Sequence, residues 1–169
     1  MMYQYKNPRL ASQYRGTMSL LLVLGIEAHL GCLAAVASAP ADYWCVVPST
    51  KVPPPEQQLR QIVRSLEPRP AELTVELGNV VESRTLDPAR YKPFSRLDGE
   101  HVLLIDDSWV TGSSAQSAAA ALKLAGAGQV STLIVARILD PAGWPPTRRY
   151  LNSTPDAIYD PQVCPWGGR

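Results

Sequence analysis

The stretch of this chain that most restricts its fold is residues 101–126. Val102–Ile105 is a run of four apolar residues, which is typical of a strand buried on both faces of a parallel sheet. Asp106 and Asp107 follow at the point where such a strand is expected to end. Because open α/β sheets bind ligands beyond the carboxyl ends of their strands, the two adjacent carboxylates form a candidate ligand site.

A helix is predicted after the short polar loop that follows the acidic pair. Ser113 and Gln116 have the spacing of a capping box, in which the two side chains bond backbone amides at the start of a helix. Gly126 lies where a glycine commonly ends a helix. Apolar residues recur between them at the i, i+3, i+4 and i+7 positions of one helix face: Ala115, Ala118, Ala119 and Leu122. This unit of strand, acids, loop and helix predicts a site with two chemically distinct ends.

The two ends suit two parts of one ligand. Adjacent carboxylates accept hydrogen bonds from vicinal hydroxyl groups, and they also bind metal ions. A loop rich in hydroxyl groups, followed by the amide groups of a helix N-terminus, suits a phosphate. Gly112 would let the backbone approach that phosphate closely. A diol at one end and a phosphate at the other describe a ribose 5-phosphate.

Residues 102–114, Val-Leu-Leu-Ile-Asp-Asp-Ser-Trp-Val-Thr-Gly-Ser-Ser, resemble the phosphoribosyl pyrophosphate (PRPP) binding motif of type I phosphoribosyltransferases. That motif has four apolar residues, two acids, a few variable residues and then Thr-Gly-x-Thr/Ser. The resemblance implies that Asp106 and Asp107 hold the ribose 2- and 3-hydroxyls and are the catalytic residues. It also implies that consecutive residues and their amides wrap the 5-phosphate: Val110, Thr111, Gly112, Ser113 and Ser114.

The chain departs from the family motif at two of these positions. Val110 stands where many members have Thr, so one hydroxyl for the phosphate is lost. Ser108 replaces an apolar residue that is usual directly after the acids.

The resemblance implies a glycosyl transfer. Magnesium-bound PRPP would lose pyrophosphate from C1 of the ribose, and a nitrogenous base that the sequence does not identify would take its place. Mg²⁺ is expected to arrive on PRPP rather than on a site of the protein. A non-catalytic PRPP sensor or regulator on the same fold is the alternative, which Val110 and a weak pyrophosphate loop permit.

Other readings of the acidic strand have less support. A Walker B strand would need G-x-x-x-x-G-K-[ST] elsewhere, a dinucleotide site would need G-x-G-x-x-G, and both are absent. A phospho-receiver domain would place its acids near the start of the chain. No glutaminase domain of an amidotransferase fits before residue 41. A solvated strand-to-helix turn without function remains the plain structural reading.

The remaining sequence predicts strands and helices in alternation. Strands are expected at 41–48, 72–81 and 131–139, and helices at 17–38 and 56–66. Such β-α repeats predict an α/β fold of three layers, a parallel sheet with helices on both faces. We expect a single domain over residues 1–169 with its core at about 17–139. A short hood over the site would come from the termini, mainly from the aromatic tail 140–169, which would otherwise cover a sheet edge.

Two loops are candidates for contacts with pyrophosphate. Ser49, Thr50 and Lys51 follow the first predicted strand, and the resemblance implies that this is the pyrophosphate loop, although a solvated lysine fits equally well. Residues 82–99 are a polar segment without clear period, where the family has a mobile flap over PRPP. Which basic residue of this segment reaches pyrophosphate is not readable from the sequence.

The resemblance implies small-molecule partners, PRPP and a base, and composition gives no sign of any other kind. The net charge of +1 gives no indication of a nucleic acid or a membrane surface as a partner. Residues 17–38 imitate a secretory signal or a membrane span, but Glu27 and His29 interrupt the apolar run, so we expect neither. The cysteines have no metal-ligand spacing and cannot all pair, which fits a cytoplasmic protein: Cys32, Cys45 and Cys164. A homodimer is possible, since the resembled family often dimerises.

Overall fold

The computed structural model describes residues 11–49, 56–78, 85–139, 148–149, 151–152, 160 and 162–163. Four strands form a central sheet in the order β2-β1-β5-β6, and each neighbouring pair is parallel. Their bounds are β1 Tyr43–Val46, β2 Ala71–Glu72, β5 His101–Trp109 and β6 Gln129–Arg137. The parallel sheet that the β-α alternation predicted is therefore confirmed.

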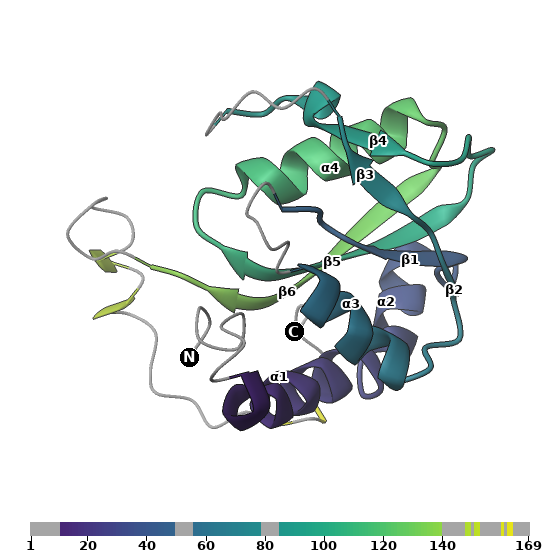
Figure 1. Cartoon of the computed structure of the whole chain (residues 1–169). Helices are drawn as coiled ribbons and strands as arrows, with labels where there is room; N and C mark the ends of the chain where they lie inside the picture. Colours follow the sequence, from purple (N-terminus) through teal and green to yellow (C-terminus); the bar gives the residue numbers. More distant parts are fainter. Residues whose placement is uncertain are drawn as a thin grey trace.

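Helices cover both faces of this sheet and complete three layers (Figure 1). The helices α1 Ala11–Ile26, α2 Leu30–Ala37 and α3 Glu56–Ser65 lie on one face, and α4 Ser113–Leu124 lies on the other. A two-stranded antiparallel ribbon, β3 Val75–Leu77 with β4 Tyr91–Pro93, packs beside α4.

The apolar run of β5 explains why both faces must be covered. Val102 and Leu104 enter the core on the α4 side, whereas Leu103 and Ile105 enter the core on the side of α1, α2 and α3. All four side chains are at most 2% exposed. Because successive strand residues point to opposite faces, an unbroken apolar run is stable only between two layers of helices.

The connections place a topological switch point between β1 and β5. From β1 the chain crosses to β2 on one side, and it later returns to β5 on the other side of β1. Open α/β folds bind ligands at such a point, beyond the carboxyl ends of the strands.

The single long helix expected at 17–38 is wrong. α1 ends at Ile26 and α2 begins at Leu30, with a bend of about 40° between them. Glu27 and His29, the polar residues that interrupt the apolar run, lie at this break. The His29 side chain is buried, with 2% exposed.

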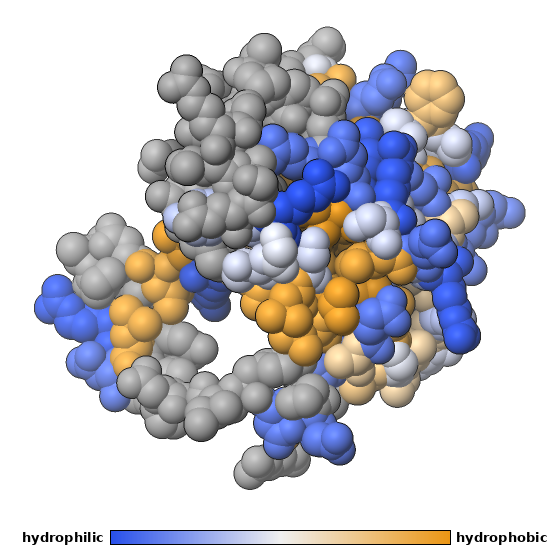
Figure 2. Space-filling view, turned by 60° about the horizontal axis from the view of Figure 1, so that its bottom comes forward, coloured by the Kyte–Doolittle hydropathy of each residue, from blue (hydrophilic) through white to orange (hydrophobic). Residues whose placement is uncertain are grey.

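The side of the molecule that α1 forms is unusually apolar. Leu20 on α1 and Val36 on α2 are each 58% exposed, and Figure 2, which brings this side forward, shows apolar side chains gathered near its centre. No single helix of the described residues has the length and composition to cross a membrane, although the bent pair α1–α2 reaches both criteria on sequence alone.

The described part of the strand expected at 72–81 contains two short strands of different sheets, and residues 79–81 lie outside the described residues. β2 pairs with β1, and Leu73 still donates its amide to the carbonyl of Trp44 at 2.8 Å, but β3 pairs only with β4. The segment 82–99, expected to be irregular, contains β4 and the 3₁₀ turn η1 Pro88–Arg90. The alternation of apolar and polar residues continued across both strands, so it gave no sign of the change of partner.

Cys45 on β1 is 1% exposed, and burial raises the pKa of its thiol to about 12 from 9.0, against a smaller lowering effect of Arg60. We expect iodoacetamide to alkylate Cys45 in the folded protein at pH 8 about 1,000-fold more slowly than in guanidinium chloride, because the thiolate is the reactive form. Peptide mass spectrometry gives the rate, with the partly exposed Cys32 as internal reference. Equal rates at the two cysteines in the native protein would contradict the buried position of β1.

Candidate functional site

The acidic pair lies where β5 outruns its neighbour β1. The register pairs Val46 of β1 with Ile105, and the Val47 amide donates to the Ile105 carbonyl at 3.0 Å. Asp106 and Asp107 come next along β5, beyond the end of β1. On the other side, β5 stays paired with β6 as far as Trp109. The prediction that this strand ends at the acids is therefore wrong, because β5 continues to Trp109. It is the neighbouring strand β1 that ends beside them.

Hydrogen bonds orient both carboxylates. The Asp107 amide donates to Oδ1 of Asp106 at 2.9 Å, and the Ser108 hydroxyl donates to Oδ1 of Asp107 at 3.0 Å. Asp107 is 5% exposed, while Asp106 is half-buried. Ser108, the departure from an apolar residue, thus holds the more buried acid.

The loop after β5 delivers backbone amides rather than a capped helix. Gly112 is the N-cap of α4 with φ +81°, and no side chain caps the helix. Ser113 is the first helical residue, so the predicted capping box of Ser113 and Gln116 is wrong. The Thr111 hydroxyl donates to the Ser113 hydroxyl at 3.2 Å and accepts from the Ser113 amide at 3.4 Å. Thr111 is exposed, and Ser113 is half-buried. An uncapped N-terminus with adjacent hydroxyls presents donors of the kind that bind an anion.

Gly112 is required here for two reasons. Its φ lies in the left-handed region, which side chains rarely adopt. In addition, a Cβ on Gly112 would come within 2.1 Å of Cζ2 of Trp109, whose indole packs against the loop. Trp109 is a functional candidate that the motif comparison did not single out, and its size in a loop of small residues was the available signal.

The other predicted phosphate residues surround this turn. Val110 is 59% exposed and offers no hydroxyl, whereas Thr111, Ser113 and Ser114 each carry one. Ser114 is half-buried in the first turn of α4.

Ser49 lies on the same edge of the sheet, two residues after Val47, and is half-buried. Its predicted companions Thr50 and Lys51 lie outside the described residues. Thus one of the three predicted pyrophosphate residues lies in the described part of the chain, at the carboxyl end of β1.

The basic residues of segment 82–99 have different surroundings. Arg90 is 8% exposed and lies over the Tyr91 ring with 5.5 Å from its guanidinium carbon to the ring centroid. Lys92 is exposed on β4, and Arg84 lies outside the described residues. A hydrogen bond connects the segment before β4 to α4: the Asp87 amide donates to the buried Ser117 hydroxyl at 2.9 Å.

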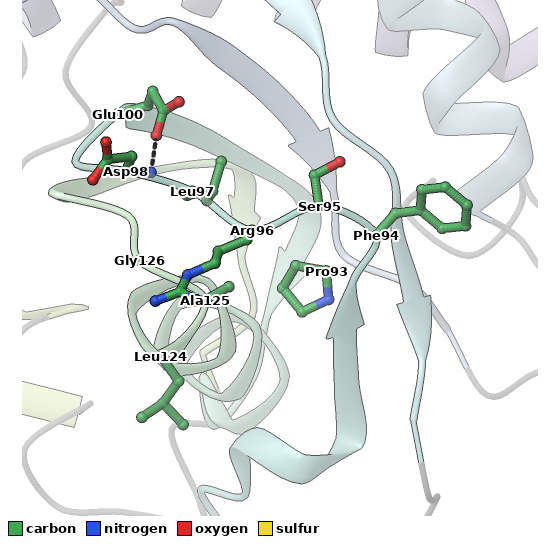
Figure 3. A pocket seen from close by; sticks show the side chains of 10 residues that line it. All are labelled: Pro93, Phe94, Ser95, Arg96, Leu97, Asp98, Glu100, Leu124, Ala125 and Gly126. Carbon is green, nitrogen blue, oxygen red and sulfur yellow. Dashed lines mark hydrogen bonds between the residues drawn. The ribbon is translucent and has the colours of Figure 1, made fainter.

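Arg96 belongs to a different region. It lines a cavity of about 870 Å³ between residues 93–100 and the end of α4 (Figure 3). This cavity is at the amino end of β5, opposite the acidic pair, and Phe94 points away from it. This cavity is therefore not part of a site that includes the acidic pair.

A smaller cavity of about 310 Å³ adjoins the phosphate loop. Trp109, Ile134 and Arg137 line it, at the carboxyl ends of β5 and β6. Only the register of the two strands brings these residues together, so no local sequence pattern indicates them as a group.

The Gly112→Ala variant tests the geometry of the loop. We expect weaker binding of inorganic phosphate and a loss of roughly 1–2 kcal/mol from the positive φ alone, with a further loss from contact with Trp109. Calorimetry and thermal unfolding give the two effects. Gly31→Ala is the matched control, since a Cβ there meets no atom within 4 Å. Phosphate affinity equal to that of the wild type in Gly112→Ala would contradict the role of the loop.

Comparisons with known proteins do not assign a family to the chain. No protein-family model and no curated protein matches the chain. Similar solved structures include an allosteric regulatory enzyme of purine biosynthesis, with 21% identity and a TM-score of 0.41 over 68% of this chain and 26% of that one. Another is a hypoxanthine phosphoribosyltransferase from Staphylococcus aureus, with 14% identity and a TM-score of 0.42 over 68% of this chain and 61% of that one. The chain thus spans about a quarter and three fifths of these neighbours, and the functional assignment rests on the site itself.

Proposed function

We propose that the chain is a phosphoribosyltransferase that transfers a 5-phosphoribosyl group from Mg-PRPP to a nitrogenous base. The observation that supports it most is the sequence of features on one continuous unit. Two oriented carboxylates project beyond the end of β1, and an uncapped helix N-terminus with three hydroxyl residues follows within a few residues. A diol and a phosphate on one sugar would satisfy both ends.

Different elements at the carboxyl end of the sheet bind different parts of the substrate. The amides at the start of α4, with Thr111, Ser113 and Ser114, bind the 5-phosphate, since a helix N-terminus favours an anion. Asp106 and Asp107 accept hydrogen bonds from the ribose hydroxyls. Ser49, Thr50 and Lys51, which follow β1 in the chain, would bind the pyrophosphate, as the resemblance implies.

Magnesium belongs to the substrate in this proposal. No group of three or more His, Cys, Asp or Glu side chains in the described part of the chain could hold a metal ion. Mg²⁺ bound to PRPP would neutralise the charge of the leaving pyrophosphate. In this arrangement the carboxylate oxygens of the acidic pair accept hydrogen bonds from the sugar hydroxyls.

Catalysis follows from charge and position. The bond from C1 to the pyrophosphate oxygen breaks and its electron pair leaves with pyrophosphate, while a nitrogen lone pair of the base forms the new bond to C1. Where that nitrogen carries a proton, the proton passes to a nearby proton acceptor. The sugar becomes positively charged in the transition state, so the carboxylates of Asp106 and Asp107 stabilise it. No protein nucleophile is needed.

A PRPP-binding regulator without turnover is the second candidate function. The observation that favours it is Val110, which is exposed and cannot give the hydroxyl that many members of the resembled family have. Pyrophosphate release with a panel of bases separates the two functions: release supports the transferase, and Mg-dependent PRPP binding without release supports the regulator.

A reducing compartment suits this protein. Neither Cys32 nor Cys45 is in a disulfide in the described part of the chain, as is usual in the cytoplasm.

The Asp107→Asn variant tests the catalytic role of the acidic pair. We expect pyrophosphate release to fall by about 100-fold or more, because the variant keeps the shape but loses the charge that stabilises the sugar cation. A coupled assay gives the rate, and circular dichroism gives the fold. Asp98→Asn is the matched control, because Asp98 is an exposed acid at the amino end of β5, away from the acidic pair. Normal release by a folded Asp107→Asn protein would refute the assignment.

A further inference from the structure

The cavity beside the phosphate loop has a chemistry that the PRPP site does not use. It occupies about 310 Å³, near the lower end of the range of about 300–1,000 Å³ for small-molecule sites. Trp109 of β5 and Arg137 of β6 are register partners, and Ile134 is the partner of Asp106. The cavity therefore lies along the same few residues of β5 as the acidic pair.

Trp109 gives this cavity an aromatic wall that is held in place. Its indole packs against Gly112 so closely that no side chain would fit there, and it also contacts the core on the α4 side. The Trp109 carbonyl accepts from the Ile138 amide at 2.9 Å, which continues the pairing with β6 past the strand end. A ring that is already fixed costs little entropy when a planar ligand stacks on it.

Arg137 gives the cavity a positive charge at its rim. The residue is exposed at the end of β6, and no ion pair joins it to an acidic side chain within the described ranges. The salt bridges of that part of the chain connect Arg60 and Arg64 to Glu72 instead. A guanidinium group in this position matches a carboxylate, which it can bind through two parallel hydrogen bonds.

The sheet order places the cavity on the side from which an acceptor would come. β1 and its loop lie on one side of β5, and β6 lies on the other. If pyrophosphate leaves towards the loop after β1, a nucleophile that enters opposite the leaving group approaches C1 from the β6 side. The carboxyl ends of β5 and β6 are where this cavity is found.

We propose that the Trp109–Ile134–Arg137 cavity is the acceptor subsite and selects a planar nitrogen heterocycle that bears a carboxylate. The ring stacks on Trp109, and its carboxylate pairs with Arg137. The new bond joins the ring nitrogen to C1 as the bond from C1 to pyrophosphate breaks, which gives the N-ribosyl 5-phosphate and pyrophosphate. An acceptor with a ring N–H also releases one proton, whereas a pyridine nitrogen releases none and becomes a pyridinium. This inference rests on the proposed transferase function.

Two matched pairs of probes test the selectivity: pyridine-3-carboxylate against pyridine-3-carboxamide, and uracil-6-carboxylate against uracil. Calorimetry measures their binding to the full chain saturated with ribose 5-phosphate, and kcat/KM for pyrophosphate release is measured with Mg-PRPP. We expect at least one carboxylate to be favoured over its neutral partner by about 10- to 100-fold, as a charged hydrogen-bonded pair would give.

Three variants assign that preference to residues. Arg137→Gln should remove it while leaving the neutral probe unchanged, and Arg137→Lys should restore part of it. Trp109→Leu should weaken both members of a pair equally. Arg69→Gln, which removes the same charge at an exposed site before β2 on the opposite edge of the sheet, should change nothing.

The outcomes separate this inference from the function on which it rests. Equal affinity for both members of each pair, no binding of any probe, or an unchanged preference in Arg137→Gln overturns the acceptor subsite. In each of these cases Mg-PRPP affinity is measured in the same preparation, and retained affinity leaves the PRPP site standing. If the wild-type protein does not bind Mg-PRPP, both the acceptor subsite and the proposed transferase function are overturned.

Discussion

The parallel pairing of β5 with both of its neighbours, between two layers of helices, is the interaction on which the structure depends. Val102–Ile105 supply side chains to the cores on both faces of the sheet, and all of them are almost completely buried. Removing either helical layer would expose half of this run to water. Since β5 is packed on both faces and paired on both sides, it sets the position of the acidic pair near its end and of the loop that follows it.

Unequal strand lengths turn this core into a site. β1 ends opposite Ile105, whereas β6 stays paired with β5 through Arg137. One side of the acidic pair is therefore open to the loop after β1, and the other is flanked by backbone. The same asymmetry gives the proposed reaction its direction, with a leaving group over β1 and an acceptor over β6. Trp109 connects the two regions because its indole contacts Gly112 and also lines the cavity beside β6.

Sequence reasoning succeeded where a pattern was local and failed where a distant partner decided the result. The β5–α4 unit was predicted because its apolar run, glycine and helix spacing all occur within 26 residues. The capping box was wrong, since the positive φ of Gly112 makes glycine the N-cap and Ser113 the first helical residue. The predicted helix at 17–38 is two helices, because His29 is buried by a bend that hydrophobicity alone does not indicate. The strand at 72–81 divides because its second half pairs with β4 rather than β1.

The sequence by itself determined the layered α/β class and the acid–loop–helix unit, because both depend on contacts between residues close in the chain. Periodicity and turn residues record such contacts directly. Only the tertiary structure decided that β1 stops one residue before the acids, that Trp109 fills the space left by Gly112, and that Arg137 stands opposite Trp109. Strand register and strand length are set by packing between segments far apart in sequence, and no local pattern contains them.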